Sequence, residues 1–188
     1  MKRYVVGITG ASGSIYGVRA LEILSTVRGA EIHLVMSPSA ARTMEIETDF
    51  RPEQIEKFAS VVHDPGNLAA TISSGSFRHD GMLVAPCSVK TAAAIAYSLN
   101  DNLLVRAADV TLKERRPLVL MVRETPLHLG HLRTLARLAM IGASIVPPIP
   151  GFYGRPQTVD DIVNHSVGKA LDALGVPNEA FARWTGRT

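Results

Sequence analysis

The chain has 188 residues, of which 46% are hydrophobic and only 5% aromatic, and its formal net charge at neutral pH is +3. A chain of this length buries a sizeable core without staples, and that core has to be aliphatic, as in parallel α/β proteins. The basic excess is scattered except at 113–116, which argues against a nucleic-acid partner. No apolar run has the length of a membrane span. We therefore expect a cytoplasmic globular protein.

Strands and helices are predicted to alternate along the chain. An apolar, β-branched strand at 4–9 leads through a glycine turn into a helix at 15–27. Further strands are predicted at 31–36, 81–87, 118–122 and 144–146, and further helical segments at 39–45, 52–61, 67–72, 88–97, 101–115, 128–141 and 159–174. This alternation predicts a single domain over 1–188 with a three-layer, Rossmann-like (flavodoxin-like) parallel sheet covered by helices on both faces. The tail from about 175 is expected to be a surface or interface arm.

The first turn, GITGASGS at 7–14, places backbone N–H groups at a helix N-terminus, where a phosphate binds well. It is not a dinucleotide fingerprint, which would need glycine at Ser12, and no Gly-Lys-Ser/Thr follows as a P-loop requires. The alternative is that its glycines only permit close packing of helix on strand. The turn alone leaves both interpretations open.

Small hydroxyl residues follow three of the predicted strands. They are Ser12 after the first strand, Ser37 and Ser39 after the second, and Ser88 and Thr91 after the strand at 81–87. Each serine is individually more typical of a helix N-cap. Their repetition at the carboxyl ends of parallel strands predicts a site for a mononucleotide phosphate and a polar ring.

Charged residues support a phosphate site after the strand at 118–122, whereas those on the helix at 101–115 allow two interpretations. Arg123 and Glu124 follow the strand at 118–122 directly, at the carboxyl edge where open α/β sheets bind ligands. Arginine suits bidentate contact with phosphate, and lysine acts as a point charge. Arg106 and Lys113 share a face of the helix at 101–115, for which a solvated or salt-bridged face is the alternative.

The histidines and the cysteine give weaker signals. His128 and His131 stand three apart without a carboxylate or cysteine partner, so no metal site is expected. Cys87 is the single cysteine, which excludes an internal disulfide. No His or Asp stands in a recognisable catalytic arrangement with it, and we predict a small buried residue.

Taken together, these segments resemble the UbiX-type flavin prenyltransferase family in order and spacing over nearly the whole chain. The matching segments are GITGASG at 7–13, LVMS at 34–37, ETD at 47–49, SSGSF at 73–77, APCSVKT at 85–91, DNLLVRAADVTLKERRPLVL at 101–120, RETPL at 123–127 and PPIPGFYGRPQ at 147–157. The resemblance implies a metal-independent enzyme that transfers a dimethylallyl group from dimethylallyl phosphate to N5 and then C6 of reduced FMN. The product, prenylated FMN, would serve a separate UbiD-type decarboxylase.

The resemblance also implies roles for individual residues. The FMN-binding positions are Gly10, Ala11, Ser12, Ser37, Ser88, Val89, Lys90, Thr91 and Arg123. Tyr153 and Lys169 match positions that hold the dimethylallyl phosphate. The catalytic candidates are Glu47, an acid near the flavin, Arg106, Lys113 and Glu124 around the phosphate, and Ser12. Ring closure needs a proton acceptor, for which Glu47, Glu124 and the released phosphate are candidates.

The chain departs from the family pattern at Lys169, where many members have Arg, and at Gly151, where Ala is common. The family further implies a homo-oligomer, with trimers arranged into a dodecamer and sites at subunit junctions. Lys113 precedes the strand at 118–122 and Arg123 follows it, so the two lie at opposite edges of the sheet. We therefore expect Lys113 and Arg106 to serve a neighbouring subunit's site.

Two other functions stay open at this point. One is an FMN-dependent decarboxylase of the related homo-oligomeric flavoproteins, which oxidises a peptidyl-cysteine, although the motifs of that group do not combine KERRPLVL with RETPL. The other is a non-catalytic flavin carrier subunit of an aromatic acid decarboxylase. A carrier should tolerate Glu47→Gln and Lys113→Ala, whereas an enzyme should not.

Overall fold

The computed structural model describes residues 1–186, in which six strands form one parallel sheet in the order β3-β2-β1-β4-β5-β6. The strands are β1 Lys2–Ile8, β2 Ala30–Met36, β3 Val61–His63, β4 Gly81–Cys87, β5 Leu118–Val122 and β6 Ser144–Ile145. The helices are α1 Ser14–Thr26, α2 Pro38–Glu47, α3 Pro52–Glu56, α4 Val89–Ala96, α5 Leu103–Lys113, α6 Leu129–Met140 and α7 Val159–Ala173, with a 3-10 turn η1 at Thr71–Ser73.

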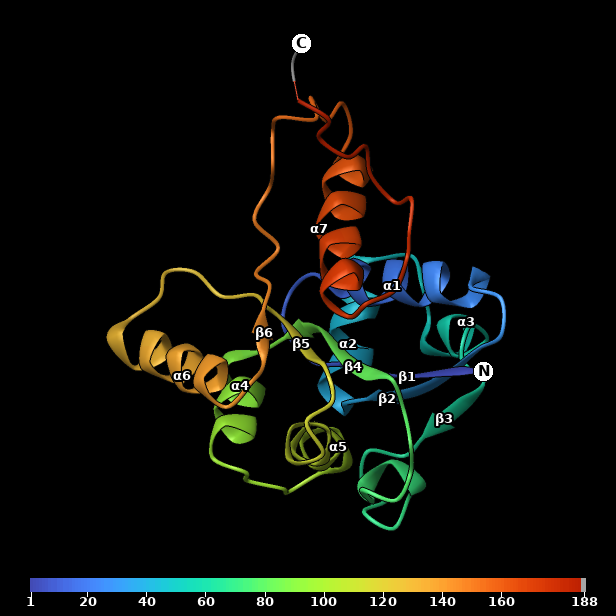
Figure 1. The fold of residues 1–188 in the computed structure, drawn as a ribbon, viewed down its shortest axis with the longest axis vertical. Coiled ribbons are helices and arrows are strands. Elements are labelled where there is room, and N and C mark those ends of the chain that lie inside the picture. Colours follow the sequence, from blue (N-terminus) through green and yellow to red (C-terminus); the bar gives the residue numbers. More distant parts are fainter. Residues whose placement is uncertain (187–188) are drawn as a thin grey trace.

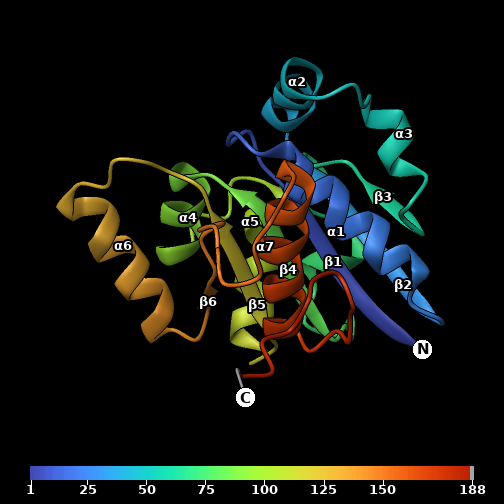
Figure 2. The ribbon, with the colours of Figure 1, turned by 90° about the horizontal axis from the view of Figure 1, so that it is seen from above.

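Helices cover both faces of this sheet, which confirms the predicted three-layer α/β fold (Figures 1 and 2). Buried side chains of α1 and α7 pack with one face, and those of α4 and α5 pack with the other. Both cores are dominated by Val, Leu, Ile and Ala, as the low aromatic content predicts. Within residues 1–186 no helix is both long and apolar enough to cross a membrane.

The order of the strands fixes where a ligand site is expected. From β1 the chain first moves to β2 on one side, and β4 then pairs with the other side of β1. In open α/β sheets such a reversal leaves a crevice outside the carboxyl ends of the two central strands. Here that crevice lies where β1 and β4 end.

The prediction of helical structure at 52–61 and 67–72 is largely wrong. In the first segment only 52–56 forms an α-helix, and 61–63 pairs as the short edge strand β3 along β2. In the second, only the last two residues are helical, in the 3-10 turn at 71–73. A strand of three residues is too short to show a two-residue alternation. In the second segment the Asn67 side chain accepts a hydrogen bond from the N–H of Ala69, and a side chain that bonds its own backbone in this way competes with helix formation.

The tail beyond α7 folds back along that helix of its own chain (Figure 1). The Asn178 amide donates to the carbonyl of Gly168 at 3.2 Å, and the Phe181 ring lies so close to Gly168 that a side chain there would collide with it. The Arg183 guanidinium donates two hydrogen bonds to the Asp172 carboxylate, at 2.8 and 2.9 Å. The tail is thus a surface arm held on α7, and its role in a subunit interface stays a prediction.

Acidification should weaken the attachment of this tail. The hydrogen bonds from Arg183 lower the pKa of Asp172 in the folded protein. Their stabilising contribution is therefore fully present above the ordinary carboxyl pKa of about 3.9 and is lost as the pH falls through the lower folded-state value. Trp184, the single tryptophan, reports on this, because its ring lies 6.1 Å from that of Tyr153.

We expect the fluorescence anisotropy of Trp184 to fall only at pH values below the ordinary carboxyl pKa, because the lowered pKa of Asp172 delays its protonation. In Asp172→Asn the anisotropy should already be low at neutral pH. An identical pH profile in both proteins would show that the ion pair does not hold the tail.

Candidate functional site

Thr9 joins the ends of β1 and β4 at the crevice. Its buried hydroxyl donates to the carbonyl of Pro86 at 2.8 Å and accepts from the N–H of Ser88 at 2.9 Å. The N–H of Ser37 donates to the carbonyl of Ile8 at 3.0 Å, which brings the end of β2 to the same edge. The expectation that three hydroxyl-bearing strand ends converge is confirmed.

The turn after β1 lies unusually close to α2. A Cβ atom at Gly10 would lie 2.5 Å from the Cβ of Ser39, a separation that real side chains do not reach. Gly10 is therefore needed for the close packing of the β1 turn against α2, which is the structural role that the sequence left open. This packing does not exclude ligand binding, because the backbone of the turn stays partly exposed.

Several backbone donors at this edge remain available to a ligand. Across residues 1–186, no acceptor is found for the N–H groups of Gly10, Ala11 and Ser12, nor for those of Val89 and Lys90 in the first turn of α4. Backbone N–H groups normally find a partner unless water or a ligand supplies one. Two sets of free donors thus flank the switch point.

The remaining donors of the glycine turn are occupied by a side chain. The Glu47 carboxylate, at the end of α2, accepts hydrogen bonds from the N–H groups of Gly13 at 2.8 Å and Ser14 at 3.1 Å. The expected phosphate guest at the α1 N-terminus is therefore replaced by a carboxylate, which the positive end of a helix also favours. A phosphate placed there would meet the charge of Glu47.

The environment of Glu47 also affects its use as a base. Partial burial raises its pKa, but the hydrogen bonds from Ser12, Gly13 and Ser14 outweigh this effect and leave the pKa below the ordinary value. A carboxylate with a lowered pKa accepts a proton less readily. Glu47 does lie beside the crevice, as expected, yet its contacts make it a support for the turn.

The serines after β2 and β4 act as N-caps. Ser37 Oγ accepts from the N–H of Ala40 at 3.1 Å, and Ser88 Oγ accepts from the N–H of Thr91 at 3.2 Å. Ser88 also donates to the hydroxyl of Thr91 at 3.1 Å. The N-cap interpretation therefore holds for both serines, and the caps fix the starts of α2 and α4 at the sheet edge.

Arg123 lies at the carboxyl end of β5, as the sequence predicts. Its backbone N–H donates to the carbonyl of Cys87 at 3.1 Å, and its side chain is exposed. Burial raises the pKa of the half-buried Tyr16, and the nearby charge of Arg123 opposes that rise. The backbone of Arg123 is thus joined to the end of β4, and its charge lies near Tyr16 of α1.

An apolar cleft of about 390 Å³ opens beside Arg123. It is lined by Val122, Arg123, Glu124, Thr125, Leu127, Leu135 and the Pro147–Pro150 segment. The Glu124 carboxylate accepts from the N–H of Thr125 at 3.0 Å, which keeps it next to this cleft. One cation and one carboxylate therefore border a mostly apolar space.

Arg106 and Lys113 do not line the cleft at Arg123 and Glu124 within their own chain. Arg106 donates to the carbonyl of Ser73 at 3.1 Å and to Asp109 at 3.3 Å, and Lys113 pairs with Glu114. Both line an open hollow formed with the 73–76 loop, and Lys113 precedes the amino end of β5. Their expected contact with a neighbouring subunit stays a prediction.

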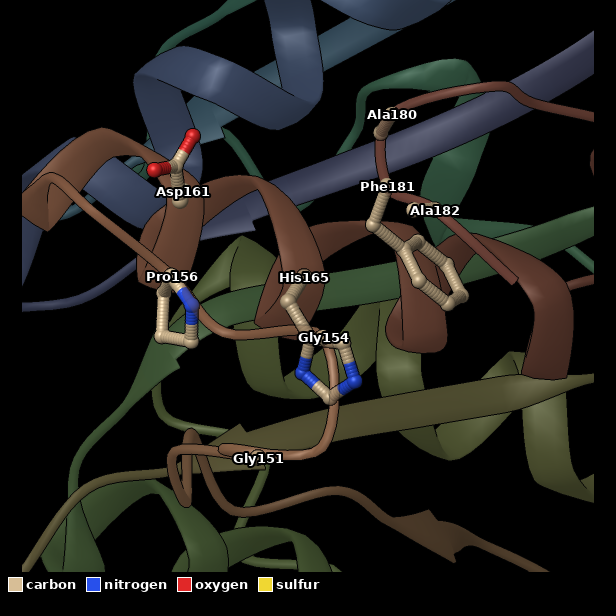
Figure 3. Close-up of a pocket in the computed structure, with 8 residues that line it drawn as sticks. All are labelled: Gly151, Gly154, Pro156, Asp161, His165, Ala180, Phe181 and Ala182. Atoms are coloured by element: carbon tan, nitrogen blue, oxygen red, sulfur yellow. The ribbon is translucent and has the colours of Figure 1, made fainter. Parts of the chain in front are cut away.

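Tyr153 lies on a different part of the surface, beside the helix α7 that carries Lys169. The Tyr153 hydroxyl is 2.7 Å from Nε2 of His165, one helical turn before Lys169 on α7. Beside them is a hollow of about 250 Å³, lined by Gly151, Gly154, Pro156, Asp161, His165 and residues 180–182 (Figure 3). The loop at 147–156 connects this hollow to the cleft at Arg123.

The weaker candidates show no catalytic arrangement. Burial raises the pKa of the Cys87 thiol to about 12, so it is not a thiolate at neutral pH. The rings of His128 and His131 stack at 3.6 Å. In the part of the chain that the structure describes, no three His, Cys, Asp or Glu side chains are grouped as metal ligands.

Three residues at these sites escaped the sequence reasoning. Thr9 and Tyr16 flank the glycine turn. Thr9 directly follows a strand and Tyr16 lies in the first turn of a helix, and these positions could have indicated them. His165 had no signal, since its partner Tyr153 lies twelve residues away in an irregular loop.

Comparison with known proteins shows which family the chain resembles. It matches the family described as Flavoprotein over residues 1–171. It is 56% identical over 188 residues to the flavin prenyltransferase UbiX of Escherichia coli K12, a match that covers 99% of this chain and 100% of that protein.

Two solved structures have nearly the same fold. A dodecameric FMN-dependent UbiX-like decarboxylase from Escherichia coli O157:H7 superposes with a TM-score of 0.96 at 48% identity, over 98% of this chain and 100% of that one. AnUbiX (PadA1), in complex with FMN and dimethylallyl pyrophosphate, superposes with a TM-score of 0.95 at 45% identity, over 100% and 99%. The chain therefore belongs to the Flavoprotein family and, within it, to the UbiX-type flavin prenyltransferases.

Proposed function

We propose that this chain transfers a dimethylallyl group from dimethylallyl phosphate to N5 and C6 of reduced FMN, without a metal ion. The observation that carries the proposal is the cleft at the carboxyl end of β5, beside the switch point, which joins an apolar wall to Arg123 and Glu124. The full-length likeness to flavin prenyltransferases supports it. Such a site suits a reaction between a flavin and a small apolar group bearing a phosphate.

FMN fits the edge formed by the β1 turn and α4. The proposed contacts are those of Gly10, Ala11, Ser12, Ser37, Ser88, Val89, Lys90, Thr91 and Arg123. The free N–H groups of the turn and of α4 would donate to its polar atoms, and Arg123 would pair with an anionic or carbonyl oxygen. Reduced FMN supplies the nucleophilic N5 and C6 atoms when bound.

The donor requires both an apolar space and cations. Leu127, Leu135 and the 147–150 segment would enclose the five-carbon group and keep water from the allyl cation that forms when its C–O bond breaks. The leaving phosphate gains charge in that step, which nearby cations stabilise. Arg106, Lys113, Tyr153 and Lys169 are the proposed phosphate contacts.

The structure favours one carboxylate over the other as the proton acceptor. Glu47 is held by two backbone N–H groups and has a lowered pKa. Glu124 borders the cleft in which the prenyl group would lie. We therefore assign the proton at C6 to Glu124 or to the released phosphate, and assign Glu47 to holding the Ser12 turn.

Assembly is part of the proposal. Arg106 and Lys113 lie far from Arg123 in their own chain, so we propose a homo-oligomer in which they complete a neighbouring subunit's site. A structurally similar relative is described as dodecameric, and we propose the same state here. The product would pass to a UbiD-type decarboxylase in the cytoplasm.

The decarboxylase and carrier alternatives predict different chemistry. A prenyltransferase should release inorganic phosphate from dimethylallyl phosphate only when reduced FMN is present under anaerobic conditions. Phosphate release without flavin would indicate simple hydrolysis, and turnover of a cysteinyl peptide would favour the decarboxylase. Unchanged activation of a partner decarboxylase by Glu47→Gln and Lys113→Ala would favour a carrier.

A further inference from the structure

Among residues 1–186, the Tyr153 side chain makes one polar contact. Its Oη atom lies 2.7 Å from Nε2 of His165, and the two rings meet edge-on with their centroids 5.4 Å apart. The residue is 48% exposed, which leaves its side chain accessible to a ligand. A hydroxyl has one proton to donate, and the direction of that O–H bond depends on whether Nε2 of His165 donates or accepts a hydrogen bond.

The His165 ring is fixed from two sides (Figure 3). The Phe181 ring meets it edge-on at 4.9 Å, and the backbone of Gly151 lies against the other side. A Cβ at Gly151 would come within 2.9 Å of His165 Cε1 and 3.1 Å of Tyr153 Cε1. Because Gly151 has no side chain, the rings of Tyr153 and His165 can pack against its backbone.

The surroundings of Nδ1 determine the tautomer. Within the described residues, Nδ1 of His165 is buried and has no hydrogen-bond partner. A proton on Nδ1 would leave a buried N–H without an acceptor, which native proteins rarely contain. The proton of neutral His165 therefore belongs on Nε2, from which it is donated to Tyr153 Oη. The hydroxyl proton of Tyr153 is then free to point away from α7.

A cation stands on the same face of α7. Lys169 follows His165 by four residues, which places the two side chains one turn apart on the helix. Lys169 is exposed and its charge contributes to the lowered pKa of Asp172. A free O–H and an ammonium group on one face form a pair of donors for an anion.

We propose that His165 is a positioning residue for the Tyr153 hydroxyl, which it holds as an acceptor so that the O–H donates to a phosphate oxygen of the donor substrate. This rests on the proposed function, in which Tyr153 and Lys169 contact the phosphate. His165 itself touches no reacting atom. Its effect should therefore appear in the binding of the phosphate-bearing substrate and not in the binding of FMN.

Replacement of the ring by one without nitrogen tests this directly. In the intact oligomer, His165→Phe should raise the KM for dimethylallyl phosphate about tenfold and also lower kcat, with FMN affinity nearly unchanged, because the lost hydrogen bond to the phosphate strengthens as the phosphate gains charge. His165→Gln supplies an amide N–H near the place of Nε2 and should restore most of the affinity. An unchanged KM in His165→Phe would overturn the proposal.

The Tyr153 hydroxyl gives a second criterion. If His165 acts through it, His165→Phe should have little further effect on KM in a Tyr153→Phe background, whereas independent roles would give additive effects. Gly151→Ala should also raise the KM, because its Cβ displaces the pair. Gly154→Ala is the matched control, since its Cβ would meet no atom within 4 Å.

Binding of inorganic phosphate to the FMN-loaded protein, measured by calorimetry, separates this proposal from the proposed function. If the wild-type protein forms no prenylated flavin but His165→Phe weakens phosphate binding through Tyr153, the function is wrong and the positioning role stands. If prenylated flavin forms and neither the KM nor phosphate binding responds to His165→Phe, the positioning role alone is wrong.

Discussion

Replacement of Arg123 by alanine should abolish measurable prenyl transfer at micromolar FMN. Arg123 is the cation at the carboxyl end of β5 beside the switch point and the apolar cleft. Loss of charge-assisted hydrogen bonds to a bound flavin should reduce the binding free energy by about 2 to 3 kcal/mol, which weakens FMN binding about 100-fold. Calorimetric titration with FMN measures this loss.

Two further variants sharpen the test. Arg123→Lys keeps the charge but loses the bidentate geometry, so its affinity should lie between those of the wild type and Arg123→Ala. Arg28→Ala removes an exposed arginine from the turn between α1 and β2, at the opposite edge of the sheet, and should bind FMN normally. Equal FMN affinity of Arg123→Ala and the wild type would remove Arg123 from the site.

Mixing two inactive variants should restore activity if sites are shared between subunits. Lys113→Ala and Arg123→Ala should each be inactive alone, because each destroys one part of every site. In randomly mixed oligomers, about a quarter of the sites take an intact Arg123 from one chain and an intact Lys113 from another. We therefore expect about a quarter of the wild-type activity after co-expression.

The control for this experiment uses two residues that the same chain would contribute. Arg106 and Lys113 line one hollow, so each neighbouring site would take both from a single chain. A mixture of Arg106→Ala and Lys113→Ala should therefore stay inactive. Mixed Lys113→Ala and Arg123→Ala oligomers that form but show no activity would place the complete site within one chain.

The sheet was predictable because its strands are long enough to carry a pattern. The segments at 81–87 and 118–122 are apolar throughout, as buried parallel strands should be, and both are fully buried. The edge strand β3 has three residues, two of them exposed, and its pairing with β2 depends on contacts that no local pattern records. Local sequence therefore identified the core strands and the edge strand β6, and missed the edge strand β3.

The site was predictable to the extent that strand ends determine it. Arg123, Ser37 and Ser88 lie at the carboxyl edge because the strands before them are parallel. Only the family resemblance indicated that Glu47 lies near the flavin, because it is 34 residues from Gly13 along the chain and reaches it through the packing of α2. His165 had no such indication, since its position depends on how the 147–158 loop returns to α7.

The central claim is that this chain makes prenylated FMN, and the mass of the flavin product tests it most directly. Purified protein should be incubated without oxygen with reduced FMN and dimethylallyl phosphate, and the flavin extracted for mass spectrometry. We predict a flavin heavier than FMN by one C5H8 unit, formed with wild-type protein and absent with Arg123→Ala. Recovery of unchanged FMN from the wild-type reaction would contradict the assignment.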